Sequence, residues 1–157
     1  MFSIGDKILY PMHGAGIIQE IEEKDILGET RRYYILRLPY GDMNVMIPVD
    51  NSTDIGIRPI INRDAIEGVF VVLRATTSEM SNNWNRRYRE NMEKLKTGDI
   101  LEVAEVVRNL TRTDRVKKLS TGEKKMLNNA KQILESELIL AGDMDPTQID
   151  DLVEEAV

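Results

Sequence analysis

The spacing of hydrophobic residues changes once along the chain, near Asn62, and this change most constrains the fold. Before it, apolar residues form short runs separated by turn signals rich in Gly, Pro and Asp, which is typical of short antiparallel strands. After it, they recur every three or four residues, which is typical of amphipathic helices. The sequence therefore predicts an α+β protein with two domains, residues 1–60 and 61–157.

The first 60 residues contain four apolar runs with turn signals between them. We expect strands at Lys7–Tyr10, Gly16–Ile26, Arg31–Leu38 and Met43–Val49, before the segment closes at Gly56–Pro59. Turns are predicted at Pro11–Gly16, Leu27–Glu29 and Tyr40–Asp42. Short strands joined by tight turns favour a small, strongly bent antiparallel barrel. A domain of this size is marginally stable alone, so we expect it to contact the helices that follow.

Capping signals precede the helical patterns of the second domain. They are Asn62 or Asp64, the Ser81–Asn83 cluster, Asp99, Ser120 with Glu123 three residues later, and Asp145 with Pro146 at the first helical position. Ala75–Met80 is a predicted linker, and the helix after it is expected to end near Thr97 and Gly98. The sequence thus predicts a small helical bundle.

The composition excludes several classes of function. The chain has no Cys, and His13 is its only His, so disulfides, thiolate nucleophiles and His/Cys zinc sites are excluded. Gly14-Ala15-Gly16 precedes a strand and is only a fragment of a dinucleotide-binding motif. We predict no catalytic residue, no metal and no cofactor, hence no enzyme. With no apolar run of about 20 residues and no signal-peptide pattern, we predict no membrane span and a cytoplasmic location.

The charge is unevenly distributed. The formal net charge is −6, which argues against strong DNA binding by the free protein. Residues 81–131, however, contain 13 Lys and Arg against 7 Asp and Glu. A moderately basic segment within an acidic protein can contact phosphates, but it gains little from long-range attraction.

The only Trp in the chain lies near the start of this basic segment. In the stretch Ser81–Arg89, Trp84 is followed by Arg86, Arg87, Tyr88 and Arg89. At about 100° per residue, Trp84 lies on one helical stripe with Tyr88, Met92 and Leu95, so it is either part of the core or an exposed functional group. A flat aromatic ring beside cations suits a wedge pressed against nucleic-acid bases. The residues alone leave both interpretations open.

The order and spacing of several motifs resemble the CarD/CdnL family of bacterial transcription regulators along nearly the whole chain. The motifs are Gly5-Asp6, Tyr10–Gly14, Gly41-Asp42 with Pro48, Val72–Arg74, Asn83–Tyr88, Gly98-Asp99, Val103–Arg108 and Leu119–Leu127. The resemblance implies a Tudor-like N-terminal module that binds the β subunit of RNA polymerase. It also implies a helical domain that contacts promoter DNA at the upstream edge of the transcription bubble and stabilises the open complex.

The resemblance also assigns roles to residues. Trp84 corresponds to the family's wedge at the minor groove, and the predicted DNA-binding residues are Trp84, Arg86, Arg87 and Arg89. The predicted polymerase-binding residues are Lys24, Tyr34, Met46, Ile47 and Pro48. Met46 stands where family members often have a basic residue, which is a departure from the pattern. An exposed edge strand of the first domain is a further candidate for pairing with a polymerase strand.

These observations leave two hypotheses from different classes. The first is a monomeric, polymerase-tethered factor that contacts promoter DNA without reading its sequence, because no helix carries an array of base-reading side chains. The alternative is a protein-interaction adaptor without DNA contact, which predicts a buried Trp84. A sequence-specific repressor would need a base-reading helix that the sequence does not contain.

Overall fold

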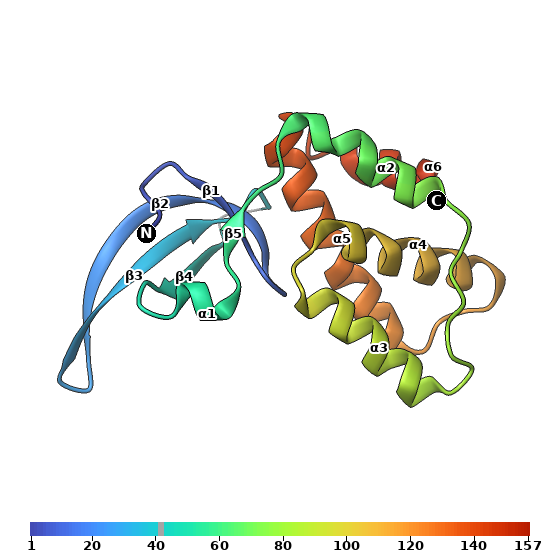
Figure 1. Ribbon diagram of the computed structural model, residues 1–157, viewed down its shortest axis with the longest axis horizontal. Helices are drawn as coiled ribbons and strands as arrows, with labels where there is room; N and C mark the ends of the chain where they lie inside the picture. Colours follow the sequence, from blue (N-terminus) through green and yellow to red (C-terminus); the bar gives the residue numbers. More distant parts are fainter. Residues whose placement is uncertain (41–42) are drawn as a thin grey trace.

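The computed structural model, which describes residues 1–40 and 43–157, contains a β-sheet and a helical region side by side (Figure 1). The sheet comprises β1 (Lys7–Tyr10), β2 (Gly14–Ile26), β3 (Glu29–Arg37), β4 (Asn44–Pro48) and β5 (Arg58–Pro59), with the short helix α1 (Ser52–Ile55) before β5. The helical region comprises the 3₁₀ turn η1 (Arg63–Ala65), α2 (Ile66–Arg74), α3 (Trp84–Lys96), α4 (Ile100–Val116), α5 (Thr121–Gly142) and α6 (Ile149–Ala156). The predicted α+β class is therefore confirmed.

The sheet is bent but does not close into a barrel. Its strand order is β4-β3-β2-β1-β5, all pairs are antiparallel, and no pairing among the described residues joins β4 to β5. The predicted bend is present, because β2 and β3 curve along their length (Figure 1) and their register shifts between Ile18 and Glu20. The edge strand β5 is short and pairs with β1 through only Ile8 and Leu9, so the described strands form an open sheet with β4 and β5 at its edges.

The turns follow the expected chemistry. Leu27 and Gly28 both have positive φ (54° and 80°), which matches the right-handed twist of the β2–β3 hairpin. β2 begins at Gly14, two residues earlier than predicted, and the short helix α1 was not predicted. The turn expected at Tyr40–Asp42 lies partly outside the described residues.

Predicted caps begin four of the helical segments, and one of them, Asn83 of the Ser81–Asn83 cluster, caps α3. The side chains of Asn62, Asp99 and Ser120 accept hydrogen bonds from the backbone N–H groups of Ala65, Leu101 and Glu123. The last helix differs from the prediction, because Pro146 lies in a turn and α6 begins only at Ile149. The carboxylate of Asp145 accepts from the N–H and hydroxyl of Thr147, which stabilises this turn instead of the first helical turn.

The helices share a large apolar core centred on α4 and α5. The side chains of Val107, Leu110, Leu134 and Leu138 are fully buried, and two sheet residues, Leu9 and Ala15, belong to the same cluster. A second cluster within the sheet contains Ile8, Ile18, Tyr34, Leu36 and Ile47. The smaller core belongs to the sheet, and the end of the sheet near Leu9 and Ala15 extends the larger one.

Polar contacts attach this end of the sheet to α5. The backbone N–H of Ala15 donates to Ser136 Oγ at 2.9 Å. Gly14 has a φ of 119°, and a Cβ there would lie 2.9 Å from the same oxygen, so only Gly fits this approach without strain. Arg58 of β5 forms two hydrogen bonds with the carboxylate of Glu137, at 2.7 and 2.8 Å. As expected, the sheet and the helices pack together.

Candidate nucleic-acid interface

Trp84 is the first residue of α3 and is 41% exposed. The residue before it, Asn83, caps the helix by accepting the N–H of Arg86 at 3.0 Å. Along the predicted stripe, Tyr88 and Met92 are half-buried and only Leu95 is fully buried. The stripe therefore anchors the C-terminal half of α3 in the core and leaves Trp84 at the surface, which does not match the buried Trp84 that the adaptor hypothesis predicts.

Contacts on three sides fix the indole ring of Trp84. Its ring stacks on Tyr88, with the centroids 5.1 Å apart and an interplanar angle of 21°. Its Nε1–H donates to Ser120 Oγ at 3.0 Å, which joins α3 to the cap of α5. Gly122 lies beside the six-membered ring, and a Cβ at this Gly would be 3.4 Å from Trp84 Cζ2. The ring is exposed yet held in one orientation.

Arg87, which was predicted to bind DNA, is paired with Glu123 of α5. Arg87 Nε and Nη2 donate to the two carboxylate oxygens at 2.9 and 3.1 Å, and Nη1 donates to the carbonyl of Ser81. The Glu123 side chain is only 3% exposed. The hydrogen bond from Arg87 is the main cause that lowers the pKa of Glu123 below its ordinary value. The sequence showed Glu123 only as part of a capping box and did not indicate this ion pair.

Arg86 and Arg89 differ in their partners. Arg86 Nε donates to Glu90 Oε1 at 2.8 Å in an exposed i,i+4 pair. Arg89 is exposed and has no hydrogen bond or ion pair with any described residue. Of the two arginines, Arg89 is therefore the freer cation for an incoming phosphate.

Four exposed lysines near Ser120 were not singled out from the sequence. Lys117 and Lys118 precede Ser120 and line a hollow of about 350 Å³ together with Ser81 and Asn82. Lys124 and Lys125 lie in the first turns of α5, after the cap. Their signal was present in the sequence as two Lys-Lys pairs within the basic segment. The N-termini of α3 and α5 thus meet at Trp84, where basic side chains and the positive ends of two helices favour anions.

The predicted polymerase-binding residues lie on the sheet and differ in exposure. Lys24 is exposed on β2, opposite Arg31 of β3, and Met46 of β4 is 39% exposed. Pro48 is half-buried, whereas Tyr34 and Ile47 are fully buried in the core of the sheet. The Tyr34 hydroxyl accepts the N–H of Phe2 at 3.0 Å, so this side chain secures the N-terminal segment.

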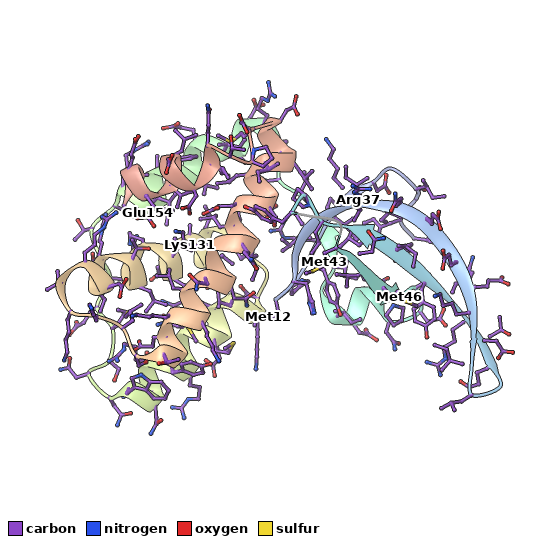
Figure 2. All side chains as sticks on the ribbon, turned by 180° about the vertical axis from the view of Figure 1, so that it is seen from behind. Met12, Arg37, Met43, Met46, Lys131 and Glu154 are labelled. Carbon is purple, nitrogen blue, oxygen red and sulfur yellow. The ribbon has the colours of Figure 1, made fainter. Side chains whose placement is uncertain are left out.

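Among the described residues, strand β4 pairs with β3 alone and is therefore an open edge. At the two ends of this ladder, Val49 N donates to Arg32 O and Leu38 N donates to Met43 O. Hydrogen-bonding directions alternate along an antiparallel strand, so Val45 and Ile47 face β3 while Asn44 and Met46 face outward. Figure 2 shows Met46 on the sheet, away from the helical side that carries Lys131 and Glu154. Two N–H donors and the carbonyls beside them are thus open to another strand.

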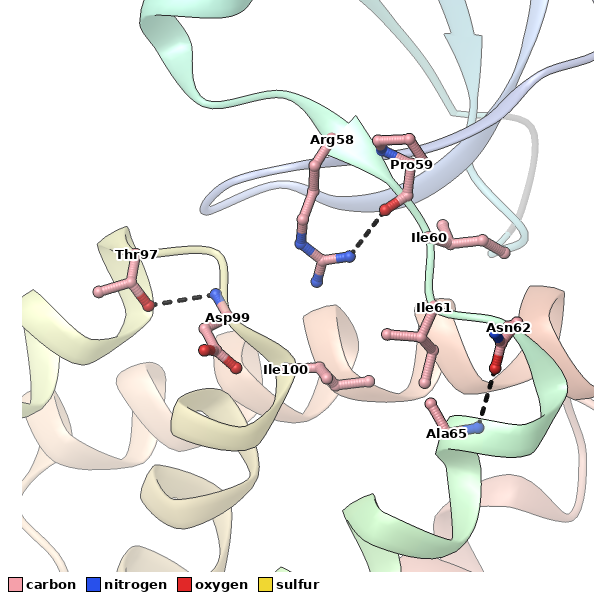
Figure 3. A pocket seen from close by; sticks show the side chains of 9 residues that line it. All are labelled: Arg58, Pro59, Ile60, Ile61, Asn62, Ala65, Thr97, Asp99 and Ile100. Atoms are coloured by element: carbon pink, nitrogen blue, oxygen red, sulfur yellow. Dashed lines mark hydrogen bonds between the residues drawn. The ribbon is translucent and has the colours of Figure 1, made fainter.

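A different hollow, of about 570 Å³, separates the segment after β5 from the turn between α3 and α4 (Figure 3). Its lining residues are Arg58, Pro59, Ile60, Ile61, Asn62, Ala65, Thr97, Asp99 and Ile100. Arg58 is already paired with Glu137 and donates to the Gly98 carbonyl, so the hollow offers no free cation of its own.

Residues 1–40 and 43–157 contain no cluster of potential metal ligands. None of the described helices has the length and apolar character to cross a membrane.

Comparison with known proteins identifies both halves of the chain. Residues 2–61 match the CarD-like/TRCF RID domain, and residues 68–154 match the CarD C-terminal domain. A Bacillus subtilis (strain 168) protein named "Putative transcription factor YdeB" is 46% identical over 138 residues, covering 88% of this chain and 90% of that protein. Because the second domain match alone spans more than half of the chain, the protein belongs to the CarD family, a non-enzymatic family, as its sequence predicts.

Proposed function

We propose that this protein is a transcription factor that binds the β subunit of RNA polymerase through its sheet and promoter DNA through the N-terminus of α3. On DNA it stabilises the open complex by placing Trp84 at the upstream edge of the bubble. The observation that carries the proposal is an exposed but firmly held Trp84, 41% exposed, at the meeting point of two helix N-termini. The match of residues 2–61 to the CarD-like/TRCF RID domain supports the polymerase side.

A wedge of this kind needs an exposed flat ring and nearby cations. Opening a base step costs a few kcal/mol, and stacking of an aromatic ring on the exposed base offsets part of this free energy. Arg89, and Arg86 once it leaves Glu90, would contact the sugar-phosphate backbone. Phosphate and stacking contacts carry little sequence information, so the factor acts at many promoters.

The charge of the protein explains why a tether is needed. A net charge of −6 disfavours binding of the free protein to DNA. Attachment to polymerase makes the second contact intramolecular, so weak DNA contacts suffice. On this proposal, residues 1–60 are the tethering unit and residues 61–157 the DNA-contacting unit of a monomer. A polymerase partner also implies a cytoplasmic location.

The edge strand β4 is the proposed tethering surface. Its outward N–H groups at Asn44 and Met46 would pair with a strand of the polymerase β subunit. Met46 and Pro48, and Lys24 on β2, would add side-chain contacts. Because Tyr34 and Ile47 are fully buried, they would support the strand from the core instead of reaching the partner.

The test is the lifetime of the open complex formed by cognate polymerase with wild-type protein and with Trp84→Ala. We expect wild type to lengthen the lifetime. With Trp84→Ala we expect a lifetime about tenfold shorter than with wild type, since base–aromatic stacking contributes about 1–3 kcal/mol. Leu101→Ala is a matched control, because Leu101 is a large apolar residue of similar exposure, 44%, on another helix. Polymerase affinity should be unchanged in both variants.

The alternative adaptor function predicts a different result. If Trp84→Ala is folded, binds polymerase and prolongs the open complex as well as wild type does, Trp84 is not a wedge and the DNA-contact proposal fails.

A further inference from the structure

We infer that Ser120, Glu123 and Arg87 are positioning residues that hold the indole of Trp84 in the orientation in which it meets DNA. This inference rests on the proposed function, because it assigns to these three side chains a role in the wedge. It also gives Arg87 a role different from the direct DNA contact expected from the sequence.

The first link is the hydroxyl of Ser120. Its oxygen accepts the indole Nε1–H of Trp84 at 3.0 Å and the backbone N–H of Glu123 at 3.2 Å. The Ser120 hydroxyl in turn donates its proton to Glu123 Oε1, at an oxygen–oxygen distance of 3.4 Å. A hydroxyl has one proton and two lone pairs, and all three are used. Its orientation is therefore fixed, and with it the direction from which the indole N–H is bound.

The second link is the ion pair of Glu123 with Arg87. The carboxylate is nearly buried and receives two hydrogen bonds from the guanidinium, at 2.9 and 3.1 Å. Arg87 also donates to the carbonyl of Ser81, just before the Asn83 cap. The chain of contacts thus runs from the start of α3, through α5, and back to the ring at the start of α3. With its carboxylate held by Arg87, Glu123 keeps the Ser120 proton directed away from the indole.

Restraining the Trp84 ring before it binds favours its insertion between bases. A side chain that is free in solution loses conformational freedom when it is inserted between bases, which weakens binding. Stacking on Tyr88 restrains the face of the ring, and the Ser120 hydrogen bond restrains its rotation within that plane. Because the only hydrogen bond of the indole is to Ser120, the described part of the chain gives Trp84 no second partner that could replace it.

The sole Trp provides a direct measurement. A ¹H–¹⁵N spectrum of the protein contains one indole N–H signal, which reports on the Trp84–Ser120 hydrogen bond alone. We expect Ser120→Ala and Glu123→Gln to move this signal upfield and to speed its exchange with water. In the polymerase assay, the open-complex lifetime should be about threefold shorter with either variant than with wild type. This is the expected cost of ordering one large side chain on binding when it is no longer held in advance. Ser120→Thr keeps the hydroxyl and should restore both properties.

The control separates positioning from loss of helix capping. Asp99 caps α4 as Ser120 caps α5, but it does not contact Trp84. Asp99→Ala should therefore lose a similar capping energy and leave the indole signal and the open-complex lifetime unchanged. Circular dichroism and polymerase binding establish that every variant is folded and tethered.

The outcomes distinguish this inference from the proposed function. If Trp84→Ala shortens the lifetime but Ser120→Ala and Glu123→Gln do not, the wedge stands and the positioning role is wrong. The role is also wrong if the variants shorten the lifetime without changing the indole signal. If Trp84→Ala itself has no effect on the lifetime, the proposed function fails first.

Discussion

The three arginines in the first half of α3 have different partners and therefore different roles. Arg86 pairs with Glu90 one turn along the same helix, Arg87 pairs with the buried Glu123 of α5, and Arg89 has no partner among the described residues. All three lie within four positions of the sequence, so their spacing could not separate them. Arg86 has its partner one turn along its own helix, whereas the partner of Arg87 lies on α5, so the packing of α3 against α5 gives Arg87 its separate role.

Glu135 is a second residue whose environment changes its chemistry. It is 6% exposed, its Oε1 accepts from the Tyr40 hydroxyl at 3.3 Å, and its Oε2 is buried with no hydrogen-bond partner in the described residues. Burial first, and then the Asp150 carboxylate, raise the pKa of Glu135 to about 8. At neutral pH, Glu135 is therefore largely protonated in the folded protein.

This shift predicts a pH dependence of stability. The folded protein holds the Glu135 proton up to about pH 8, while the unfolded chain loses it near 4.5, so the free energy of unfolding falls as pH rises between these values. Glu135→Gln removes this titration, and we expect the fall in the free energy of unfolding between pH 5 and 9 to be smaller in the variant by up to about 4 kcal/mol. Urea denaturation at several pH values between 5 and 9 measures the effect. If wild type and variant fall in parallel, Glu135 is not the responsible group.

At the scale of elements, two helix N-termini and one strand edge carry the proposed function. The caps of α3 and α5 meet at Trp84, because the Ser120 that caps α5 also binds the indole N–H. On the sheet, the alternation of β4 leaves the N–H groups of Asn44 and Met46 unpaired with β3. Strand β4 therefore offers backbone groups for pairing, whatever its side chains are.

A pair of substitutions separates backbone from side-chain binding at this edge. Met46→Pro removes an outward N–H without breaking the β3 ladder, as Pro is tolerated on edge strands. We expect about tenfold weaker binding to the polymerase β subunit, on the order of one lost hydrogen bond with its unpaired partner. Met46→Ala keeps the N–H and should bind nearly as well as wild type, when both are measured by calorimetry. Equal losses in the two variants would assign the contact to the side chain of Met46.

For the whole molecule, the relation between sheet and helices depends on a few polar contacts. Arg58 binds Glu137, whose side chain is 1% exposed, and also donates to the carbonyl of Gly98. Glu137 further accepts the N–H of Ile61 at 2.9 Å, in the segment that connects the two halves. One buried carboxylate therefore holds β5, the connecting segment and α5 together. A fixed relation between them would set where Trp84 lies when the sheet is bound to polymerase.

Glu137→Gln tests this coupling. The neutral amide leaves Arg58 without its charged partner, and we expect a loss of about 2–3 kcal/mol in the free energy of unfolding. The matched control is Glu67→Gln, because Glu67 pairs with Arg74 at a side-chain exposure of 77% and should change stability by less than about 0.5 kcal/mol. Urea denaturation measures both. Similar small losses in the two variants would show that the Glu137 pair does not secure the interface.

The sequence by itself determined the features that depend on neighbouring residues. The change of period at Asn62, the hairpin at Leu27 and Gly28, and the caps at Asn62, Asp99 and Ser120 were all predictable. Backbone conformation and capping hydrogen bonds involve residues within a few positions of one another, so local patterns specify them. The family motifs were recognisable because their order and spacing are properties of the sequence itself.

Only the tertiary structure decided which distant residues meet. It left the sheet open, buried Tyr34 and Ile47, left Trp84 exposed, paired Arg87 with a Glu 36 positions away, and enclosed Glu135 so that its pKa rises to about 8. No local pattern contains these facts, because they follow from how the sheet and the helices pack. Burial and the opposite charge across an interface are set by that packing, and they determine the charge and the exposure of each candidate site residue.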